Sequence, residues 1–346
     1  MEIGIGLDQG LRLSFSEGRE MVREAARLGY TSAWTPSNIT QDAFQICGQW
    51  SRASAEVVPG GLTTGISVVP VPIWSAPALA AAAGTVGELS EGRFILGVGS
   101  GSIHSEAYRR SFGLEAHRPI GMMREYLVAL RGLLAGESVD SDGPAVKLQG
   151  VKLGFTPPRV PLYLGALGEQ MVRLAGELAD GVGLNWCTPE QIAWSRERVA
   201  EGAKRAGRDP SAVRVAEYIR ICVDEDEDAA RRALARAVLG YALARPGASK
   251  ALSYRGHFAR MGFDEALTEL EERRDRGAAE DELAERFPTE LLQMVGYYGP
   301  AEGAAAHFRR LAEGLDVAIV RVVPAHRGPD AVAEVMQACR PELVTR

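Results

Sequence analysis

Short apolar runs alternate with amphipathic segments along most of the chain. Eight runs have the length and composition of buried strands, and each precedes residues with the apolar spacing of a helix. The predicted strands are residues 3–7, 31–35, 62–69, 93–98, 161–164, 181–184, 213–223 and 317–323. Strands that alternate with helices form parallel sheets, and eight such units indicate a closed (β/α)8 barrel. An open, doubly wound sheet with an appended helical domain is the alternative.

Two segments interrupt this alternation. Residues 139–153 read VDSDGPAVKLQGVKL and predict a hairpin with an Asp-Gly turn, placed after the fourth helix of the barrel. Residues 241–299 are highly charged and have helical periodicity, which predicts a helical insertion between strands 7 and 8. We expect this insertion to cover the barrel mouth or to contribute to a dimer interface. The whole chain, residues 1–346, is expected to be one barrel domain.

Composition excludes several classes of protein. The net charge of −6 argues against a nucleic-acid partner, because phosphate binding needs a basic excess. Residues 57–87 carry no charge, but four prolines interrupt them, so we expect a buried strand and helix rather than a membrane span. The four cysteines are far apart and form no CxxC pair, which favours a cytoplasmic protein without a metal site. The opening residues, MEIGIGL, have no signal-peptide pattern.

Glycine and small polar residues follow several predicted strands. They include Asn38 after strand 2, Gly99, Ser100, Gly101 and Ser102 after strand 4, Gly165 to Gly168 after strand 5, and Asn185 after strand 6. In a barrel these carboxyl ends form the active site. The sequence has no GxSxG, HExxH or GxxxxGK[ST] motif. Such a mouth favours an enzyme whose cofactor supplies the chemistry.

Three motifs have both a functional and a structural interpretation. GVGSGS, residues 97–102, matches a dinucleotide fingerprint poorly; it is either a loop that lets a cofactor approach the backbone or plain packing. LGALGEQ, residues 164–170, places glycines before a helix, where free N–H groups bind anions, although a structural turn would look the same. TTGISVVPVP, residues 63–72, has a glycine and a serine inside an apolar strand, which predicts a bulge or a close contact.

Together these motifs resemble a known family. The stretches WTPSN, TTGISVVPVPIWSAPALAAAAGTVGELSEGRFILGVGSGS and PLYLGALGEQMVRLAGELADGVGLN are similar to the bacterial luciferase-like superfamily. Within it they resemble the deazaflavin branch, which uses coenzyme F420 and includes methylenetetrahydromethanopterin reductases and glucose-6-phosphate dehydrogenases. The resemblance covers most of residues 1–225 and residues 298–324.

The resemblance implies a homodimeric barrel with an insertion, a small-molecule substrate, and F420 lying across the mouth. It also implies a cis peptide bond between Ser67 and Val68, and a phosphate site in the Gly165–Gly168 turn. The cofactor-binding residues expected from it are Asn38, Ser67, Val68, Gly99, Ser100, Gly101, Ser102, Gly165, Ala166, Leu167, Gly168 and Asn185.

The chain also departs from the branch that oxidises sugar phosphates. Ser37-Asn38 and Ser102 replace residues that could accept a hydroxyl proton there, and alcohol oxidation needs such a base. We therefore expect hydride transfer that reduces a C=N or an activated C=C bond. His104 and Glu106 are the candidate proton donors. The alternatives are an FMN-dependent monooxygenase that uses O₂, and a flavin- or deazaflavin-binding protein without catalysis.

Overall fold

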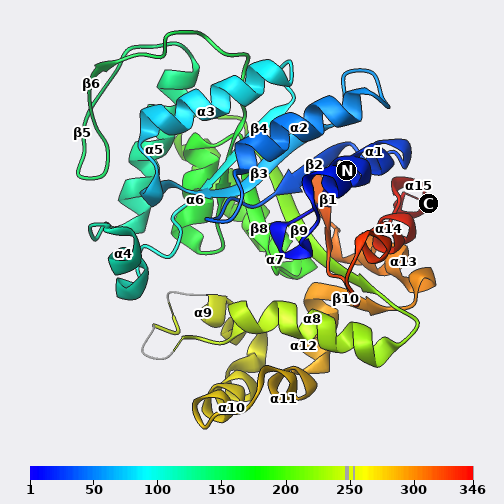
Figure 1. Cartoon of the computed structure of the whole chain (residues 1–346). Coiled ribbons are helices and arrows are strands. Elements are labelled where there is room, and N and C mark those ends of the chain that lie inside the picture. The colour runs from blue at the N-terminus through cyan, green and yellow to red at the C-terminus, as the bar shows by residue number, and fades with distance from the viewer. Residues whose placement is uncertain (246–248, 252–253, 346) are drawn as a thin grey trace.

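Eight parallel strands close into a barrel in the computed structural model, which describes residues 1–245, 249–251 and 254–345 (Figure 1). They are β1 (Glu2–Gly6), β2 (Ser32–Thr35), β3 (Thr63–Pro70), β4 (Phe94–Gly99), β7 (Leu162–Gly165), β8 (Gly181–Asn185), β9 (Arg214–Val223) and β11 (Val317–Val322). Neighbouring strands pair in this order, and β11 pairs with β1 to complete the ring. The predicted barrel is confirmed, and the open sheet is excluded.

Helices cover the outside of the barrel and bury its outward-facing apolar residues. The main ones are α1 (Phe15–Arg27), α2 (Ala43–Ala55), α3 (Ala76–Leu89), α5 (Pro119–Leu134), α6 (Glu169–Leu178), α7 (Pro189–Arg205), α13 (Ala301–Leu311) and α14 (Pro329–Ala338). Several begin where a polar side chain accepts hydrogen bonds from the first free N–H groups, as Ser14 does for α1 and Asp42 for α2. Two short helices, α4 (Glu106–Phe112) and α15 (Pro341–Val344), complete this layer. Among the described residues, none of the helices combines the length and apolarity needed to cross a bilayer.

The predicted hairpin is also present. β5 (Val139–Asp142) and β6 (Lys147–Val151) pair antiparallel after α5. The carboxylate of Glu125, on α5, accepts hydrogen bonds from the backbone N–H groups of Ala145 and Val146 at 2.8 and 2.9 Å. These contacts fix the hairpin turn against the barrel.

The insertion forms a second apolar core beside the barrel. This core is formed by α8 (Glu227–Ala242), the helix that follows β9, together with the insertion, which comprises α9 (Tyr254–Phe258), a π-helical turn (Ala259–Phe263), α10 (Asp264–Asp275), α11 (Glu280–Glu285) and α12 (Thr289–Val295). Figure 1 shows α8 to α12 gathered on one side of the barrel. Leu234, Val238, Phe258, Leu267 and Leu291 are buried in this core.

One strand in this region is not predicted from the sequence. β10 (Gly296–Gly299) follows α12 and pairs in parallel with the carboxyl end of β9. It has four residues, two of them glycine, and it follows a charged helical segment. The apolar pattern that predicts a strand is therefore too short to be recognised here. The helical insertion itself lies between β9 and β11, as expected.

Candidate active site at the carboxyl ends of the strands

One side of the barrel mouth is lined by small, half-buried residues at the strand ends. They are Ser67, Val68, Gly165, Gly183 and Asn185, from β3, β7 and β8. Deeper in the barrel, large side chains such as Trp34 and Tyr163 are almost completely buried. Solvent therefore reaches the backbone at this end of the sheet, where active sites of such barrels form.

β3 carries the predicted irregularity. The peptide bond between Ser67 and Val68 is cis, and the register of β3 against β4 shifts between Ile66 and Val69. A Cβ atom on Gly97 of β4 would lie 2.3 Å from the carbonyl oxygen of Ile66. The bulge and the cis bond are confirmed, and only glycine at residue 97 lets the two strands approach this closely.

The glycines around Val68 have a packing role. A Cβ atom on Gly99 would lie 2.6 Å from Val68 Cγ2, and one on Gly165 would lie 2.9 Å from Val68 Cγ1. Gly101 has a positive φ of 56°, and its Cβ atom would lie 2.9 Å from Tyr108 Oη. Part of the glycine pattern after strand 4 therefore shapes the protein itself, around Val68 and around the loop turn.

The turn before α6 has the geometry of an anion site. Gly168 is the N-cap residue of α6, and no side chain caps this helix. A Cβ atom on Gly168 would have no atom within 4 Å, and the residue is exposed. Ala166, two residues earlier, donates its N–H to the carbonyl of Gly183 at 3.1 Å and so anchors the turn to β8. The first N–H groups of α6 are thus available to an anion.

The other side of the mouth carries two buried arginines. Gly6, Arg321 and Arg220 are in register on β1, β11 and β9, so their side-chain positions share the inner face of the barrel. The exposed fractions of Arg220 and Arg321 are 4 % and 8 %. Arg321 forms an ion pair with Asp8, which follows β1.

Arg220 is held by polar and aromatic contacts. Its Nη1 donates to the side-chain oxygen of Asn185 and, at 3.1 Å, to the carbonyl of Tyr218. Its guanidinium carbon lies 3.7 Å from the centre of the Trp186 ring, which is a cation–π contact. Burial lowers the pKa of Arg220 to about 10, so the side chain remains charged at neutral pH.

The loop after β8 is fixed by two buried groups. Trp186 has a φ of +60°, which is uncommon for a residue with a side chain. Glu217 Oε1 accepts a hydrogen bond from the N–H of Cys187 at 2.6 Å, and His257 Nε2 lies 2.8 Å from the carbonyl oxygen of Trp186. Burial raises the pKa of Glu217 to about 8 and lowers that of His257 to about 4.

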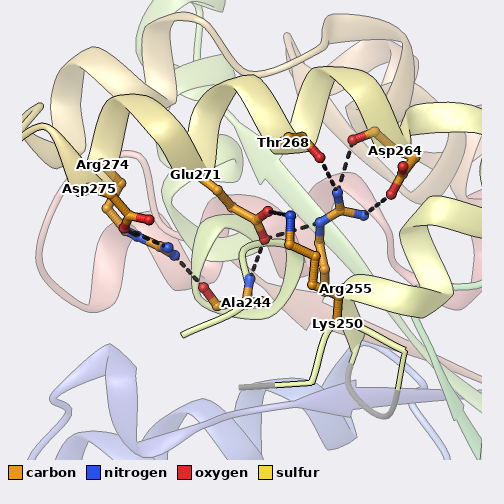
Figure 2. Close-up of polar contacts among 8 residues, drawn as sticks. All are labelled: Ala244, Lys250, Arg255, Asp264, Thr268, Glu271, Arg274 and Asp275. Carbon is orange, nitrogen blue, oxygen red and sulfur yellow. Dashed lines mark hydrogen bonds and ion pairs between the residues drawn. The ribbon is translucent and has the colours of Figure 1, made fainter. Parts of the chain in front are cut away.

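Helix α9 connects this loop to the insertion. On the barrel side, Asn185 Nδ2 donates to Tyr254 Oη at 2.8 Å. On the other side, Arg255 is fully buried, and its Nε lies 3.1 Å from Glu271 Oε1 on α10. Figure 2 shows the Arg255 guanidinium between Glu271, Thr268 and Asp264, all on α10. The insertion is therefore fixed to the carboxyl ends of the strands.

His104, Glu106 and Asn38 lie at or near the surface, on loops and at the start of α4. His104 lies in the turn after β4, where its side chain is accessible to solvent but partly covered by protein. This partial burial is the main cause of its lowered pKa, and the positive charge of Arg109 is the second cause. Glu106 begins α4 and forms an exposed ion pair with Arg110 at 2.7 Å. Asn38 is exposed and accepts a hydrogen bond from the N–H of Thr40 at 2.8 Å.

The structure groups the other predicted residues in two places. Ser67, Val68, Gly99, Gly165 and Asn185 lie at the strand ends, where Val68 contacts the positions of both glycines. The rest, Ser100, Gly101, Ser102, Ala166, Leu167 and Gly168, lie in the two loops that follow β4 and β7. Their contacts with a cofactor remain predictions.

Arg220, Arg321 and Asp8 were not among the predicted site residues. The two arginines leave a signal in the sequence: Arg321 interrupts the otherwise apolar strand 317–323, and Arg220 lies in the apolar second half of strand 213–223. A charged residue inside a buried strand is rare unless it has a partner or a function. The partners of these arginines cannot be identified from the arginine strands themselves, because Asp8 follows β1 and Asn185 ends β8.

Comparison with known proteins identifies the family. Residues 2–317 match the sequence profile of the family described as luciferase-like monooxygenase. The chain belongs to this family.

The chain is also similar to individual members of this luciferase-like family. The chain is 40% identical over 166 residues to the 5,10-methylenetetrahydromethanopterin reductase of Methanolobus tindarius. The matched residues are 48% of this chain and 49% of the relative, so the chain spans about half the length of that relative. A Mycobacterium tuberculosis protein, provisionally named as a coenzyme F420-dependent oxidoreductase, is 30% identical, with 84% of this chain and 87% of the relative covered. The solved structure of the F420-dependent tetrahydromethanopterin reductase from Methanopyrus kandleri has a TM-score of 0.79, covers 99% of both chains and is 20% identical. The last likeness shows the shared fold.

Proposed function

We propose that this luciferase-like protein is a coenzyme F420-dependent oxidoreductase that reduces a C=N or an activated C=C bond of a small organic substrate. The name of the Mycobacterium relative supports the choice of cofactor, and the name of the Methanolobus relative, a reductase, supports the direction of the reaction. The observation that carries the proposal is the half-buried row of small residues at the β3 bulge and the neighbouring strand ends, together with the uncapped amino end of α6.

The residues present fit a flat, phosphorylated cofactor. Ser67 and Val68 would support the ring from β3, because the bulge brings their backbone to the surface of the mouth. The turn that ends at Gly168 would bind the phosphate, because the N–H groups at the start of α6 have no side-chain cap. Asn185 would contact the cofactor from the end of β8, the strand next to the one that leads into this turn.

The chemistry then divides between the cofactor and the chain. When bound and reduced, F420 supplies the hydride. The chain would orient the substrate, exclude water and deliver a proton. We keep His104 and Glu106 as the proposed donors because both follow the glycine loop after β4, at the active end of the barrel.

FMN is the second candidate, because the family description names monooxygenases. The two cofactors differ in one decisive respect: reduced FMN reacts with O₂ through a C4a adduct, whereas the deazaflavin cannot form that adduct. A third candidate is cofactor binding without any turnover. The homodimer implied by the resemblance belongs to the same proposal and can be checked by sedimentation.

Cofactor titration tests these candidates. The purified protein is titrated separately with F420 and FMN, and binding is followed by fluorescence. The reduced complexes are then mixed with cyclic imines and enones in the presence of O₂. We expect tighter binding of F420, and its reoxidation when an acceptor substrate is added. Tighter binding of FMN with O₂ consumption would contradict the proposal, and so would F420 binding without reoxidation by any acceptor.

A further inference from the structure

We propose that the substrate carries a carboxylate and that Arg220 binds this carboxylate in the barrel mouth. This inference rests on the proposed function and specifies its substrate class. Its starting point is a difference between two neighbouring arginines. Arg321 and Arg220 are in register on β11 and β9, yet only Arg321 has a carboxylate partner, Asp8, among the residues that the structure describes.

The first argument is the charge of Arg220. Its exposed fraction is 4 %, and within the described ranges it forms no ion pair with Asp or Glu. Burying a charge without a counter-ion is costly, so buried arginines are normally paired. Together Arg220, Arg321 and Asp8 carry one net positive charge. A monoanionic carboxylate would neutralise it, whereas a dianionic phosphate would leave an excess of negative charge.

The nearest acidic group on the same strand does not supply this neutralisation. Glu217 lies three residues before Arg220 on β9, and successive side chains of a strand point to opposite faces. Its carboxyl binds the N–H of Cys187 instead. Burial holds the pKa of Glu217 at about 8, so its neutral form predominates at pH 7.

The second argument is the orientation of the guanidinium. Nη1 makes both of its hydrogen bonds to described residues, one to Asn185 and one to Tyr218, which leaves the edge formed by Nε and Nη2. Stacking on Trp186 at 3.7 Å fixes the plane of the group. A planar group held in this way presents two parallel N–H donors, the geometry that matches a carboxylate.

The third argument is the surroundings of Arg220. Asn185, its hydrogen-bond partner, is half-buried and belongs to the solvent-accessible row at the strand ends. Two neighbouring donors, Trp186 Nε1 and Tyr218 Oη, are buried and have no hydrogen-bond partner in the described part of the chain. Glu217 Oε2 is also buried without a partner there, but its carboxyl is mostly neutral at pH 7, so the unpartnered groups beside Arg220 are mainly donors, as expected for a site that receives an anion.

Binding of small carboxylates tests this inference. Benzoate, cinnamate and crotonate, each with its neutral amide, are titrated calorimetrically into the protein with and without saturating F420. The variants are Arg220→Gln, Arg220→Lys and, as a control, Arg124→Gln, which removes an exposed arginine that pairs with Glu177 on the outside of the barrel.

We expect at least one carboxylate to bind the unchanged protein more tightly than its amide. Arg220→Gln should weaken carboxylate binding by about 10- to 100-fold, the size expected for lost charge-assisted hydrogen bonds. Arg220→Lys should retain part of the affinity, and the control should retain all of it. Amide binding should be the same in Arg220→Gln and the unchanged protein, and any change in F420 affinity, through the Asn185 contact, should be smaller than the change in carboxylate affinity.

Three results would overturn the inference. The first is that no carboxylate binds better than its amide, which can be measured without any variant and so does not depend on the folding of Arg220→Gln. The second is equal carboxylate binding after Arg220→Gln. The third is a loss of F420 affinity alone in that variant, which would assign Arg220 to the acidic groups of the cofactor. Failure of F420 to bind the unchanged protein would contradict the proposed function, while the titrations without cofactor would still decide the role of Arg220.

Discussion

Glu217 accepts a hydrogen bond from the backbone N–H of Cys187 at 2.6 Å, in a place where its carboxyl is almost completely buried. Burial raises its pKa from 4.5 to about 8. Between these values the folded protein holds a proton that the unfolded chain releases, so the free energy of unfolding falls as the pH rises. The neutral carboxyl stabilises the loop between β8 and α7.

The pH dependence of stability gives the first prediction. His257 has the opposite effect between pH 4 and 6.5, because its pKa is lowered from 6.5 to about 4. The window from pH 6.5 to 8 therefore isolates Glu217, and the unfolding free energy should fall there by about 1–2 kcal/mol. Glu217→Gln keeps an acceptor for the Cys187 N–H and should abolish this fall in urea denaturation, whereas Glu197→Gln, on the surface of α7, should preserve it. A fall of the same size in Glu217→Gln would contradict the assignment.

The buried pair between Arg255 and Glu271 gives the second prediction. Arg255 is fully buried, and Glu271 also receives the N–H of Ala244 at 2.8 Å and pairs with Lys250 at 2.6 Å (Figure 2). Glu271→Ala leaves the guanidinium with Asp264 as its remaining ion-pair partner, and the protein should lose about 3 kcal/mol of stability.

The matched control for this pair is Glu177→Ala, which breaks the exposed contact of Glu177 with Arg124 and should cost far less. The double variant Arg255→Met, Glu271→Leu should recover part of the loss, because no unpaired charge remains buried. Thermal denaturation measures all three variants. Similar losses of stability in Glu271→Ala and Glu177→Ala would show that the buried ion pair stabilises the protein no more than the exposed one.

The glycines of the turn before α6 give the third prediction. Gly168→Val places a side chain in open space beside the first N–H groups of α6, so F420 affinity should fall by about tenfold while thermal stability stays unchanged. Gly165→Val should have a different effect, because the new side chain would clash with Val68. Thermal stability and F420 affinity should both fall in this variant. Gly154→Val, at another open loop position, is the control for both measurements. Unchanged F420 affinity in Gly168→Val would remove this turn from the cofactor site.

The proposed proton donors give the fourth prediction. His104→Gln or Glu106→Gln should leave F420 affinity intact and lower the rate of substrate reduction by about 10²–10⁴ for the true donor. Because the pKa of His104 is lowered, the protonated fraction and the reduction rate should both increase as the pH falls, if His104 is that donor. His307→Gln, on helix α13 outside the barrel, serves as the control. Unchanged turnover in both variants would leave solvent as the proton source.

The barrel could be predicted because its signal is local. Apolar runs and helical spacing locate eight strands and their helices, and the helix at 169–178 has the predicted ends because glycine precedes it and its apolar residues recur every three or four positions. β10 could not be predicted, because a strand as short as GYYG acquires its identity from pairing with β9. Helix α4 could not be predicted either, because a helix of seven residues that follows a glycine loop is too short to show a clear helical period.

The candidate site was only partly predictable. The cis bond at Ser67–Val68 followed from the family resemblance, whereas the partners of Arg220 depend on how β8, β9 and β11 lie beside one another. The glycine motif after strand 4 had two interpretations, and the structure shows that Gly99 makes room for Val68. The sequence indicates that a side chain is absent, but only the fold shows what occupies the space.

β9 changes partners along its length. Its first half pairs with β8 up to Tyr218, and from Arg220 onward that edge is taken by β10, which lies beyond the insertion in the chain. The eight-stranded ring can thus close before the insertion has folded, but the sheet edge beside Arg220 is complete only after β10 has docked. We therefore expect the binding end to mature last: a chain in which β11 has closed the ring but residues 296–299 have not yet paired with β9 would hold a barrel without a finished mouth.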